Sequence, residues 1–386
     1  MTQGNVQARP LGTHASSYLT ATLAALWMAC GQTANLRAAD ESPARVVVLK
    51  APEGGLQPQA AVDASGTIQL VYLKGEPGSC DVYCSTWAPG ASGFSAPLRV
   101  NSQPGSAVAI GTIRGAHLAL GRKGRAHVAW NGSMNSGRGK NPSLGSPMLY
   151  SRMNDAGTAF EPERNLMTRT SALDGGGTVA ADQEGNVCVL WHGRAPGAAD
   201  GEMGRSVWVA RSSDDGATFA PEEPATADLT GACGCCGTRA FADRSGAVYM
   251  LYRAATGGVE RDMTLLVSRD QGKRFERTVL DGWRINQCTM SSESITEGPK
   301  GVMAAWETKG QVWFGQVSSQ SPGSTSRIPA PGSTGDRKHP ALACKSAGQM
   351  ILVWTEGTGW QRGGSLAWQV FDSAGQPTSD RGRVDG

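Results

Sequence analysis

The chain has 386 residues, of which 39% are hydrophobic and 18% are charged, with 52 glycines and 20 prolines. This apolar content excludes a disordered chain, and the length allows one large all-β domain or two to three smaller domains. The net charge of +3 is small and no basic run is interleaved with aromatic residues, so neither nucleic acid nor an anionic membrane surface is an expected partner.

Residues 1–39 are typical of an export signal followed by a disordered leader. Basic residues precede the mostly apolar run YLTATLAALWMACG, which is too short for a membrane span. Cys30 raises lipid attachment as an alternative, but Trp27 and Met28 are poor residues before a lipidated cysteine. We therefore expect a periplasmic or extracellular protein with no transmembrane segment, and we expect it to be a monomer.

A turn followed by an alternating strand recurs six times, and every copy runs nine residues from its first position to an aromatic residue. Five copies have Gly at the fourth position, and the fifth copy shifts it by one. Gly supplies the positive φ of a hairpin turn, and the alternation predicts a strand. The copies are DASGTIQLVY (63–72), GRKGRAHVAW (121–130), DQEGNVCVLW (182–191), DRSGAVYMLY (243–252), EGPKGVMAAW (297–306) and KSAGQMILVW (345–354).

Each copy is preceded by one short strand of small residues and is usually followed by two more strand-like stretches, with no convincing amphipathic helix. Six units of four strands predict an all-β fold in which residues 40–386 form a single six-bladed β-propeller. The segment ARVVVLK (44–50) lies where a fourth strand lies in the other units, so we expect it to complete the sixth blade and close the ring. A β-sandwich is the alternative, but it would leave the six equal intervals to coincidence.

The innermost strand of each blade lines the central axis of a propeller, so the segments that enter these strands meet at one mouth. Aligning the copies places Arg114 and Asp174 on this ring, while His192, Arg194 and Arg253 follow second strands that return to the same mouth. These five residues are candidates for binding a glycan or another small anionic ligand. The alternative is that they are ordinary loop residues.

Soft ligands from blades four, five and six are also expected to meet at the mouth; they are Cys233, Cys235, Cys236, Cys288, Met290 and His339. In an oxidising compartment a disulfide from Cys233 or Cys235 to Cys288 is one interpretation. A metal site is the second, with Cu(I) as the preferred ion and Zn as the poorer fit. A disulfide between Cys235 and Cys236 beneath a ligand is the third.

Cys80 and Cys84 in CDVYC form another candidate disulfide. By contrast, Cys188 and Cys344 lie inside predicted strands, where lone cysteines are usually small core residues.

Two segments after third strands, SSDDGATF and SRDQGKRF, fit the pattern Ser-x-Asp-x-Gly-x-x-aromatic, and MNDAGTAF is a degraded copy. The Asp can bond the backbone of its own turn, Gly takes the tight position and the aromatic ring packs beneath. The pattern is therefore interpreted as structural. Its residues are Ser212, Asp214, Gly216 and Phe219 in one copy and Ser268, Asp270, Gly272 and Phe275 in the other.

These segments are the Asp-box, and the chain resembles the sialidase-like (BNR repeat) propellers, in particular an exported bacterial branch that pairs a C-x-C-C segment with a later DGW…C segment. The resemblance implies a glycan ligand and, for sialidases proper, an exo-glycosidase that uses three arginines, a Tyr–Glu nucleophile pair and an Asp acid. That catalytic set is not found at matching positions here; the RIP motif at 327–329 leads into the sixth blade. A soft-metal or redox protein and a non-catalytic interaction scaffold remain alternatives to a glycan-binding protein or hydrolase.

Overall fold

The structure is a computed structural model that describes residues 46–386 apart from 112, 135, 137–144, 322, 324–325, 333–334 and 360–362. The predicted export signal and Cys30 lie outside these residues. The described residues from 46 to 386 form one compact unit. None of the helices described is long and apolar enough to cross a membrane.

The described chain is all-β and contains six antiparallel sheets of four strands each. The strands of the first three blades are β1 (Leu56–Val62), β2 (Ile68–Glu76), β3 (Ser79–Trp87), β4 (Leu98–Arg99), β5 (His117–Leu120), β6 (Ala126–Asn131), β7 (Met148–Arg152), β8 (Arg164–Asn165), β9 (Gly177–Ala181), β10 (Val187–Arg194), β11 (Arg205–Ser212) and β12 (Glu223–Pro224). Those of the last three are β13 (Thr238–Ala242), β14 (Val248–Arg253), β15 (Met263–Ser268), β16 (Glu276–Asp281), β17 (Glu293–Gly298), β18 (Gly301–Thr308), β19 (Gln311–Val317), β20 (Ile328–Pro329), β21 (Lys338–Cys344), β22 (Met350–Glu356), β23 (Ser365–Phe371) and β24 (Pro377–Val384). Short 3₁₀ turns lie at η1 (Pro52–Gly54), η2 (Arg122–Gly124) and η4 (Glu202–Gly204).

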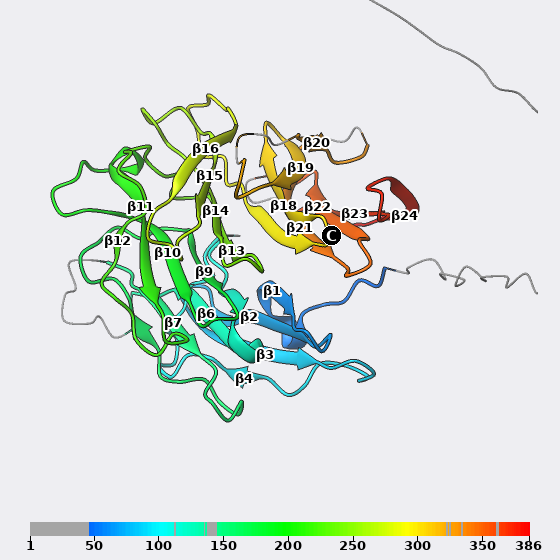
Figure 1. Cartoon of the computed structure of the whole chain (residues 1–386), viewed down its shortest axis with the longest axis horizontal. Coiled ribbons are helices and arrows are strands. Elements are labelled where there is room, and N and C mark those ends of the chain that lie inside the picture. Colours follow the sequence, from blue (N-terminus) through cyan, green and yellow to red (C-terminus); the bar gives the residue numbers. More distant parts are fainter. Residues whose placement is uncertain are drawn as a thin grey trace, which may run out of the picture. The chain divides into compact units, whose positions relative to one another are not determined.

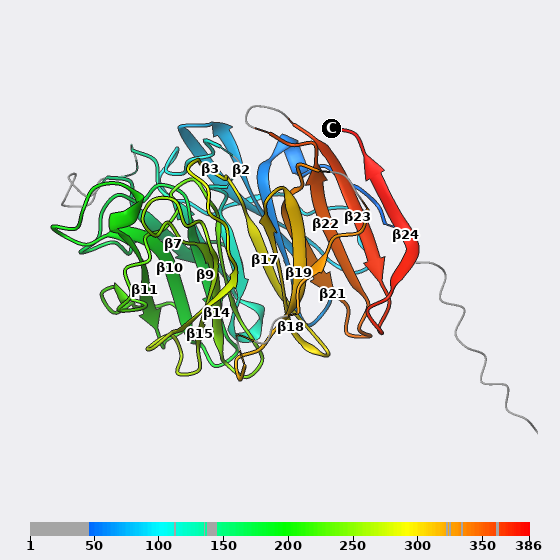
Figure 2. The same cartoon turned by 90° about the horizontal axis from the view of Figure 1, so that it is seen from above.

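The sheets follow one another around a common centre in chain order, with the first strand of each sheet innermost (Figure 1). Figure 2 shows the strands of neighbouring sheets standing side by side along the axis. The predicted six-bladed β-propeller is therefore confirmed.

The recurring turn has a local cause. Asp63 accepts hydrogen bonds at Oδ1 from the N–H groups two and four residues later, at 2.9 and 3.0 Å, and Asp182 and Asp243 repeat this pattern. Gly66 follows with a φ of 83°, which a residue with a side chain adopts only under strain. The turn reverses the chain, and a strand that pairs with the preceding one follows.

The aromatic residues that end the copies lie in the core, each no more than 3% exposed; they are Tyr72, Trp130, Trp191, Tyr252, Trp306 and Trp354. Five buried apolar clusters join successive blades, from the first pair to the fifth and sixth. Burial of these faces is the main stabilising contribution to the fold, because each sheet covers the apolar face of its neighbour.

The expected closure of the ring by residues 44–50 is not observed. The sixth sheet has the order β21-β22-β23-β24, so its own last segment pairs with β23 and leaves that edge with no room for another strand. Residues 46–50 form no strand, and Val47, Val48 and Leu49 are exposed. The turn before β24 repeats the Asp-x-x-Gly hydrogen bonds through Asp372, but β24 is polar and its alternation is weak in the sequence.

Candidate functional site

The segments that enter the inner strands touch their neighbours and form the mouth of the propeller. Hydrogen bonds or ion pairs link them from the first blade to the sixth: Gln57 to Ala109, Arg114 to Asp174, Gly175 to Gly234, Gly237 to Ser291 and Lys338 to Thr289. Residues far apart in the sequence are thus brought to one end of the fold, as expected from the aligned copies.

Asp174 is the centre of the charged part of this mouth. Arg114 forms an ion pair with its Oδ1 and also donates from Nε to its carbonyl oxygen at 2.8 Å. Arg205, at the start of β11, lies with Nη2 3.6 Å from Asp174 Oδ2. Asn131 donates from Nδ2 to the Asp174 carbonyl at 2.8 Å. Two guanidinium groups therefore share one carboxylate, which leaves a net positive charge at this point.

A cavity of about 240 Å³ opens beside this cluster. Its polar lining includes Arg114, Asn131 and Asp174, and its apolar lining includes Ile110 and Leu173. A small hollow with a few convergent polar groups on an apolar wall is the usual form of a small-molecule site.

The CGCC segment lies next to Asp174. A Cβ atom built on Gly234 would lie 2.5 Å from Asp174 Oδ2 and would also meet the Arg205 guanidinium, so a larger residue here would displace both side-chain ends. The Gly234 N–H donates to Glu202 Oε1 at 2.7 Å, and Arg261 holds the other oxygen of Glu202 at 2.5 Å. Two carboxylates, Asp174 and Glu202, thus approach one glycine from different sides.

The four clustered cysteines form two disulfides, Cys233–Cys236 and Cys235–Cys288. The second joins the entry segment of blade four to that of blade five. Of the three interpretations of this cluster, the structure therefore has a disulfide to Cys288, and it pairs Cys236 with Cys233 rather than with Cys235. No cysteine of the cluster is left as a thiolate ligand.

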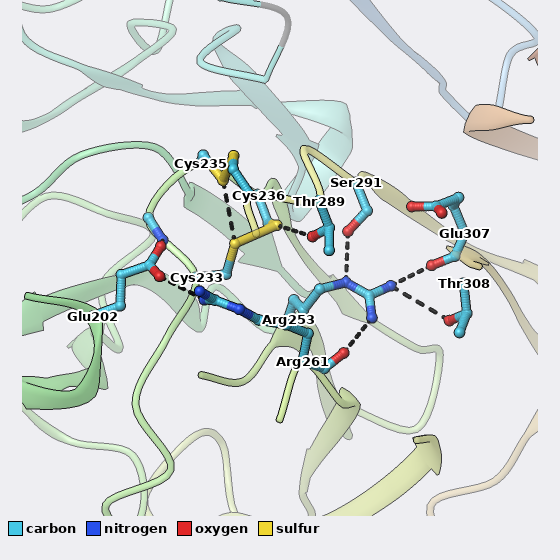
Figure 3. Close-up of a disulfide and its surroundings, with 12 residues drawn as sticks. Glu202, Cys233, Cys235, Cys236, Arg253, Arg261, Thr289, Ser291, Glu307 and Thr308 are labelled. Atoms are coloured by element: carbon cyan, nitrogen blue, oxygen red, sulfur yellow. Dashed lines mark hydrogen bonds and ion pairs between the residues drawn. A yellow bond between two sulfur atoms is a disulfide. The ribbon is translucent and has the colours of Figure 1, made fainter. Parts of the chain in front are cut away.

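Arg253 lies inside the protein rather than on the rim. It is 1% exposed, and its guanidinium donates to Ser291 Oγ at 2.6 Å and to the carbonyl oxygen of Glu307, as Figure 3 shows. Glu293 nearby is buried, and burial raises its pKa well above the usual value despite the charges of Arg253 and Arg239. Arg253 therefore anchors the entry segment of blade five and does not face a ligand.

Three other predicted site residues are divided between the interior and the rim. His192 is 1% exposed, and burial lowers its pKa to about 3, so it is neutral. Arg194 pairs with the exposed Asp200 on the rim. His339 lies with Nδ1 3.1 Å from Ser292 Oγ, and burial lowers its pKa to about 4. Only Arg194 of these three reaches solvent as a charged group. Met290, the last member of the predicted soft-ligand set, is half-buried with a φ of 46°.

The predicted disulfide between Cys80 and Cys84 is not formed, and both thiols are free and buried. The two residues lie four positions apart on the same strand, β3. A strand advances about 3.3 Å per residue, so their Cα atoms are separated by about 13 Å, beyond the roughly 7 Å that a disulfide spans.

The two Asp-boxes have the predicted turn structure. Ser212 Oγ accepts from the Gly216 N–H at 2.9 Å and Asp214 Oδ1 from the Thr218 N–H at 2.8 Å. Ser268, Asp270 and Gly272 repeat this arrangement, and Phe219 and Phe275 pack against the buried clusters. The first box follows the end of β11, whose start lies at the mouth, so it is at the opposite end of the blade.

Sequence reasoning missed Glu202, Arg205, Gly234 and Arg261. Glu202 lies in η4, in the loop from β10 to β11, and Arg205 follows this loop as the first residue of β11. The second strand of each blade was predicted to end at the mouth, so the loop that follows it also lies there. The charged residues of the DGEMGR segment in this loop could therefore have been proposed from the sequence. Gly234 was visible only as the x of C-x-C-C, and nothing local distinguishes it.

No family model and no curated protein matches the chain. Solved structures do match it. The NanB sialidase from Streptococcus pneumoniae superposes with a TM-score of 0.51 at 10% identity, over 82% of this chain and 68% of that one. The Trypanosoma rangeli sialidase, in complex with the inhibitor DANA, superposes with a TM-score of 0.52 at 10% identity, over 79% of this chain.

The chain spans only 53% of the trypanosomal protein's length. At these identities the likeness concerns the fold, and the chain has the sialidase-like six-bladed propeller fold.

Proposed function

We propose that the protein is exported and binds the acidic terminal sugar of a glycan at the mouth of the propeller. The observation that carries this proposal is the cluster in which Arg114 and Arg205 share the single carboxylate of Asp174 beside a cavity. The excess guanidinium charge suits a sugar carboxylate, because arginine pairs with carboxylates through two parallel hydrogen bonds. Asp174 and Asn131 supply acceptor and donor groups for sugar hydroxyls.

Arg205 is a candidate for a second direct contact beside Arg114, which itself lines the cavity. Its side chain is 12% exposed, its Nε donates to the Ala172 carbonyl at 3.3 Å, and its Nη2 is 3.6 Å from Asp174. These long contacts use few of its five N–H donors. A sugar carboxylate that replaced them with shorter bonds would therefore gain binding energy.

Binding without hydrolysis is favoured over a sialidase reaction. The described tyrosines Tyr72, Tyr150, Tyr249 and Tyr252 are at most 2% exposed, and Tyr83 lies on β3 stacked on Tyr72. A tyrosine nucleophile must reach the substrate, so the four buried tyrosines do not supply one. The soft-metal alternative would require both disulfides of the cysteine cluster to be reduced first.

Export agrees with the two disulfides, which persist in oxidising compartments. The compartment is tested by fractionating cells that express the full chain and locating the protein by immunoblot. Retention of an unprocessed chain in the cytoplasm would contradict export.

The ligand is tested on a glycan array that carries sialylated, uronic-acid and neutral glycans, followed by calorimetry with the best acidic sugar. R205Q and R114Q are each expected to weaken binding about 10- to 100-fold, the value of a charged hydrogen bond. R194Q, on the rim beside Asp200, is the matched control and should bind as the parent protein does.

Equal binding by the parent, R205Q and R114Q would contradict the site, and absence of binding to every acidic glycan would favour an interaction scaffold. Release of fluorophore from a 4-methylumbelliferyl glycoside of the bound sugar would show that the site also hydrolyses.

A further inference from the structure

The two disulfides of the cysteine cluster differ sharply in their access to solvent. Cys288 is exposed and Cys235 is half-buried, whereas Cys233 and Cys236 are 2% and 0% exposed. An external thiolate attacks the sulfur that it can reach, so the interblade disulfide is the point of entry and Cys288 is its outer sulfur.

The two disulfides also touch each other. Cys235 Sγ lies 3.4 Å from Cys233 Sγ, which is van der Waals contact between sulfur atoms, and Figure 3 shows Cys235 next to the Cys233–Cys236 bond. The sulfur atoms of Cys233, Cys235 and Cys236 all lie within 4.8 Å of one another. A thiolate formed on Cys235 would therefore be in contact with Cys233, and it would have to turn about its own side-chain bonds into line with the Cys233–Cys236 bond before thiol–disulfide exchange.

The far sulfur of the buried disulfide has a hydrogen-bond partner. Cys236 Sγ lies 3.0 Å from Thr289 Oγ1, a hydroxyl that is itself 4% exposed (Figure 3). When Cys236 is the leaving group, this hydroxyl can donate to the sulfur that acquires the negative charge. A hydrogen bond to the charged form favours that form, so Thr289 offsets part of the cost that burial imposes on a Cys236 thiolate.

We propose that the cluster is a thiol–disulfide relay that passes a thiolate from the exposed Cys288–Cys235 bond to the buried Cys236. In the first step an external thiolate RS⁻ attacks Cys288 Sγ; the bond RS–S(Cys288) forms, the Cys288–Cys235 bond breaks, and Cys235 leaves as a thiolate. In the second step Cys235 attacks Cys233; the Cys235–Cys233 bond forms, the Cys233–Cys236 bond breaks, and Cys236 leaves as a thiolate beside Thr289.

Each step exchanges one disulfide for another, so no electrons are gained or lost overall. The external reactant is a small thiol of the glutathione class. The covalent link between blades four and five opens, while the CGCC segment keeps one internal disulfide. The relay does not depend on the proposed sugar site.

The relay can be tested without any reductant. In C288S, Cys235 is a free thiol from the start, so the second step alone should give a Cys233–Cys235 disulfide and a free Cys236. In C235S the free thiol is the exposed Cys288 and the Cys233–Cys236 disulfide should stay intact. Both proteins are quenched with acid, alkylated with N-ethylmaleimide after denaturation, and mapped by fragmenting the non-reduced peptides.

The expected result is alkylation of Cys236 in C288S and of Cys288 alone, among the four cluster cysteines, in C235S. Alkylation of Cys236 in C288S at no more than its level in C235S would overturn the relay. T289V combined with C288S is expected to reduce the ratio of free Cys236 to free Cys235 about fivefold, the value of one ordinary hydrogen bond.

The parent protein provides a second test in case a variant fails to fold. Incubation with reduced glutathione should give a glutathione adduct on Cys288, a free Cys236 and a Cys233–Cys235 disulfide in the same molecules. An adduct on Cys288 together with a free Cys235 would overturn the relay. Folding is checked separately with a pulse of N-ethylmaleimide before denaturation, from which native protein should protect the buried thiol of Cys188.

Discussion

Replacement of Gly234 by alanine tests the geometry of the mouth most directly. The new Cβ would lie 2.5 Å from Asp174 Oδ2, whereas an ordinary contact begins at 3.4 Å. Gly234 does not have a positive φ, so the alanine backbone itself is unstrained and the clash is the main effect. Asp174 and the Arg205 guanidinium must both move, but they are the ends of flexible side chains and the Asp174 side chain is 39% exposed, so the cost in folding free energy is about 1 kcal/mol or less.

The expected result for G234A is a fall of no more than about 1 kcal/mol in the free energy of unfolding, measured by guanidinium titration. Binding of the acidic glycan should weaken as well, because the carboxylate shared by two arginines is displaced. Gly93 is the matched control, since a Cβ there has no atom within 4 Å and its φ is not positive. If G234A had the same free energy of unfolding and the same glycan affinity as G93A, the close approach of the CGCC segment to Asp174 would be refuted.

Three further predictions concern stability. C235S/C288S removes a cross-link between residues 53 apart and should lower the free energy of unfolding by about 4 kcal/mol, measured in guanidinium without reductant; an unchanged midpoint would contradict the cross-link. E222A removes the buried carboxylate that accepts from the N–H groups of Thr168, Arg169 and Thr170, of which only Thr170 is buried, and should cost about 1–3 kcal/mol, whereas the exposed neighbour in E223A should cost under about 1 kcal/mol; equal losses would contradict this. Partial burial raises the pKa of Asp270, but hydrogen bonds from its own turn outweigh this and bring it from 3.8 to about 2. The ionised Asp270 carboxylate therefore stabilises the fold above about pH 4, and this stabilisation is lost as the pH falls toward 2. The difference in the free energy of unfolding between the parent and D270N should shrink over that range in acid titrations. A constant difference would contradict the lowered pKa.

The blade pattern was predictable because its cause is local. An Asp-x-x-Gly turn is closed by hydrogen bonds within five residues, as at Asp63, and the strand after it is read from alternation and a final aromatic residue. The Asp-boxes are local in the same sense. Counting from these turns also placed Arg114 and Asp174 on one ring, because equivalent positions of equivalent strands must meet around an axis.

The polar last strand shows where the pattern fails. β24 carries few apolar residues because its outer face is exposed, so the alternation that identifies the inner strands is weak. The apolar segment 44–50 looked like the better fourth strand. Which segment occupies the free edge of β23 depends on the hairpin after β23 and not on hydrophobicity.

By itself, the sequence determined the number of blades, the positions of their turns and the ring on which the entry segments lie, since short hydrogen-bonded turns and alternation act over a few residues. Only the tertiary structure decided that Arg253 is buried, that Arg205 joins Asp174, and that Cys235 pairs with Cys288 while Cys80 and Cys84 stay apart. These outcomes depend on distances between loops from different blades, and such distances follow from how the sheets pack around the axis.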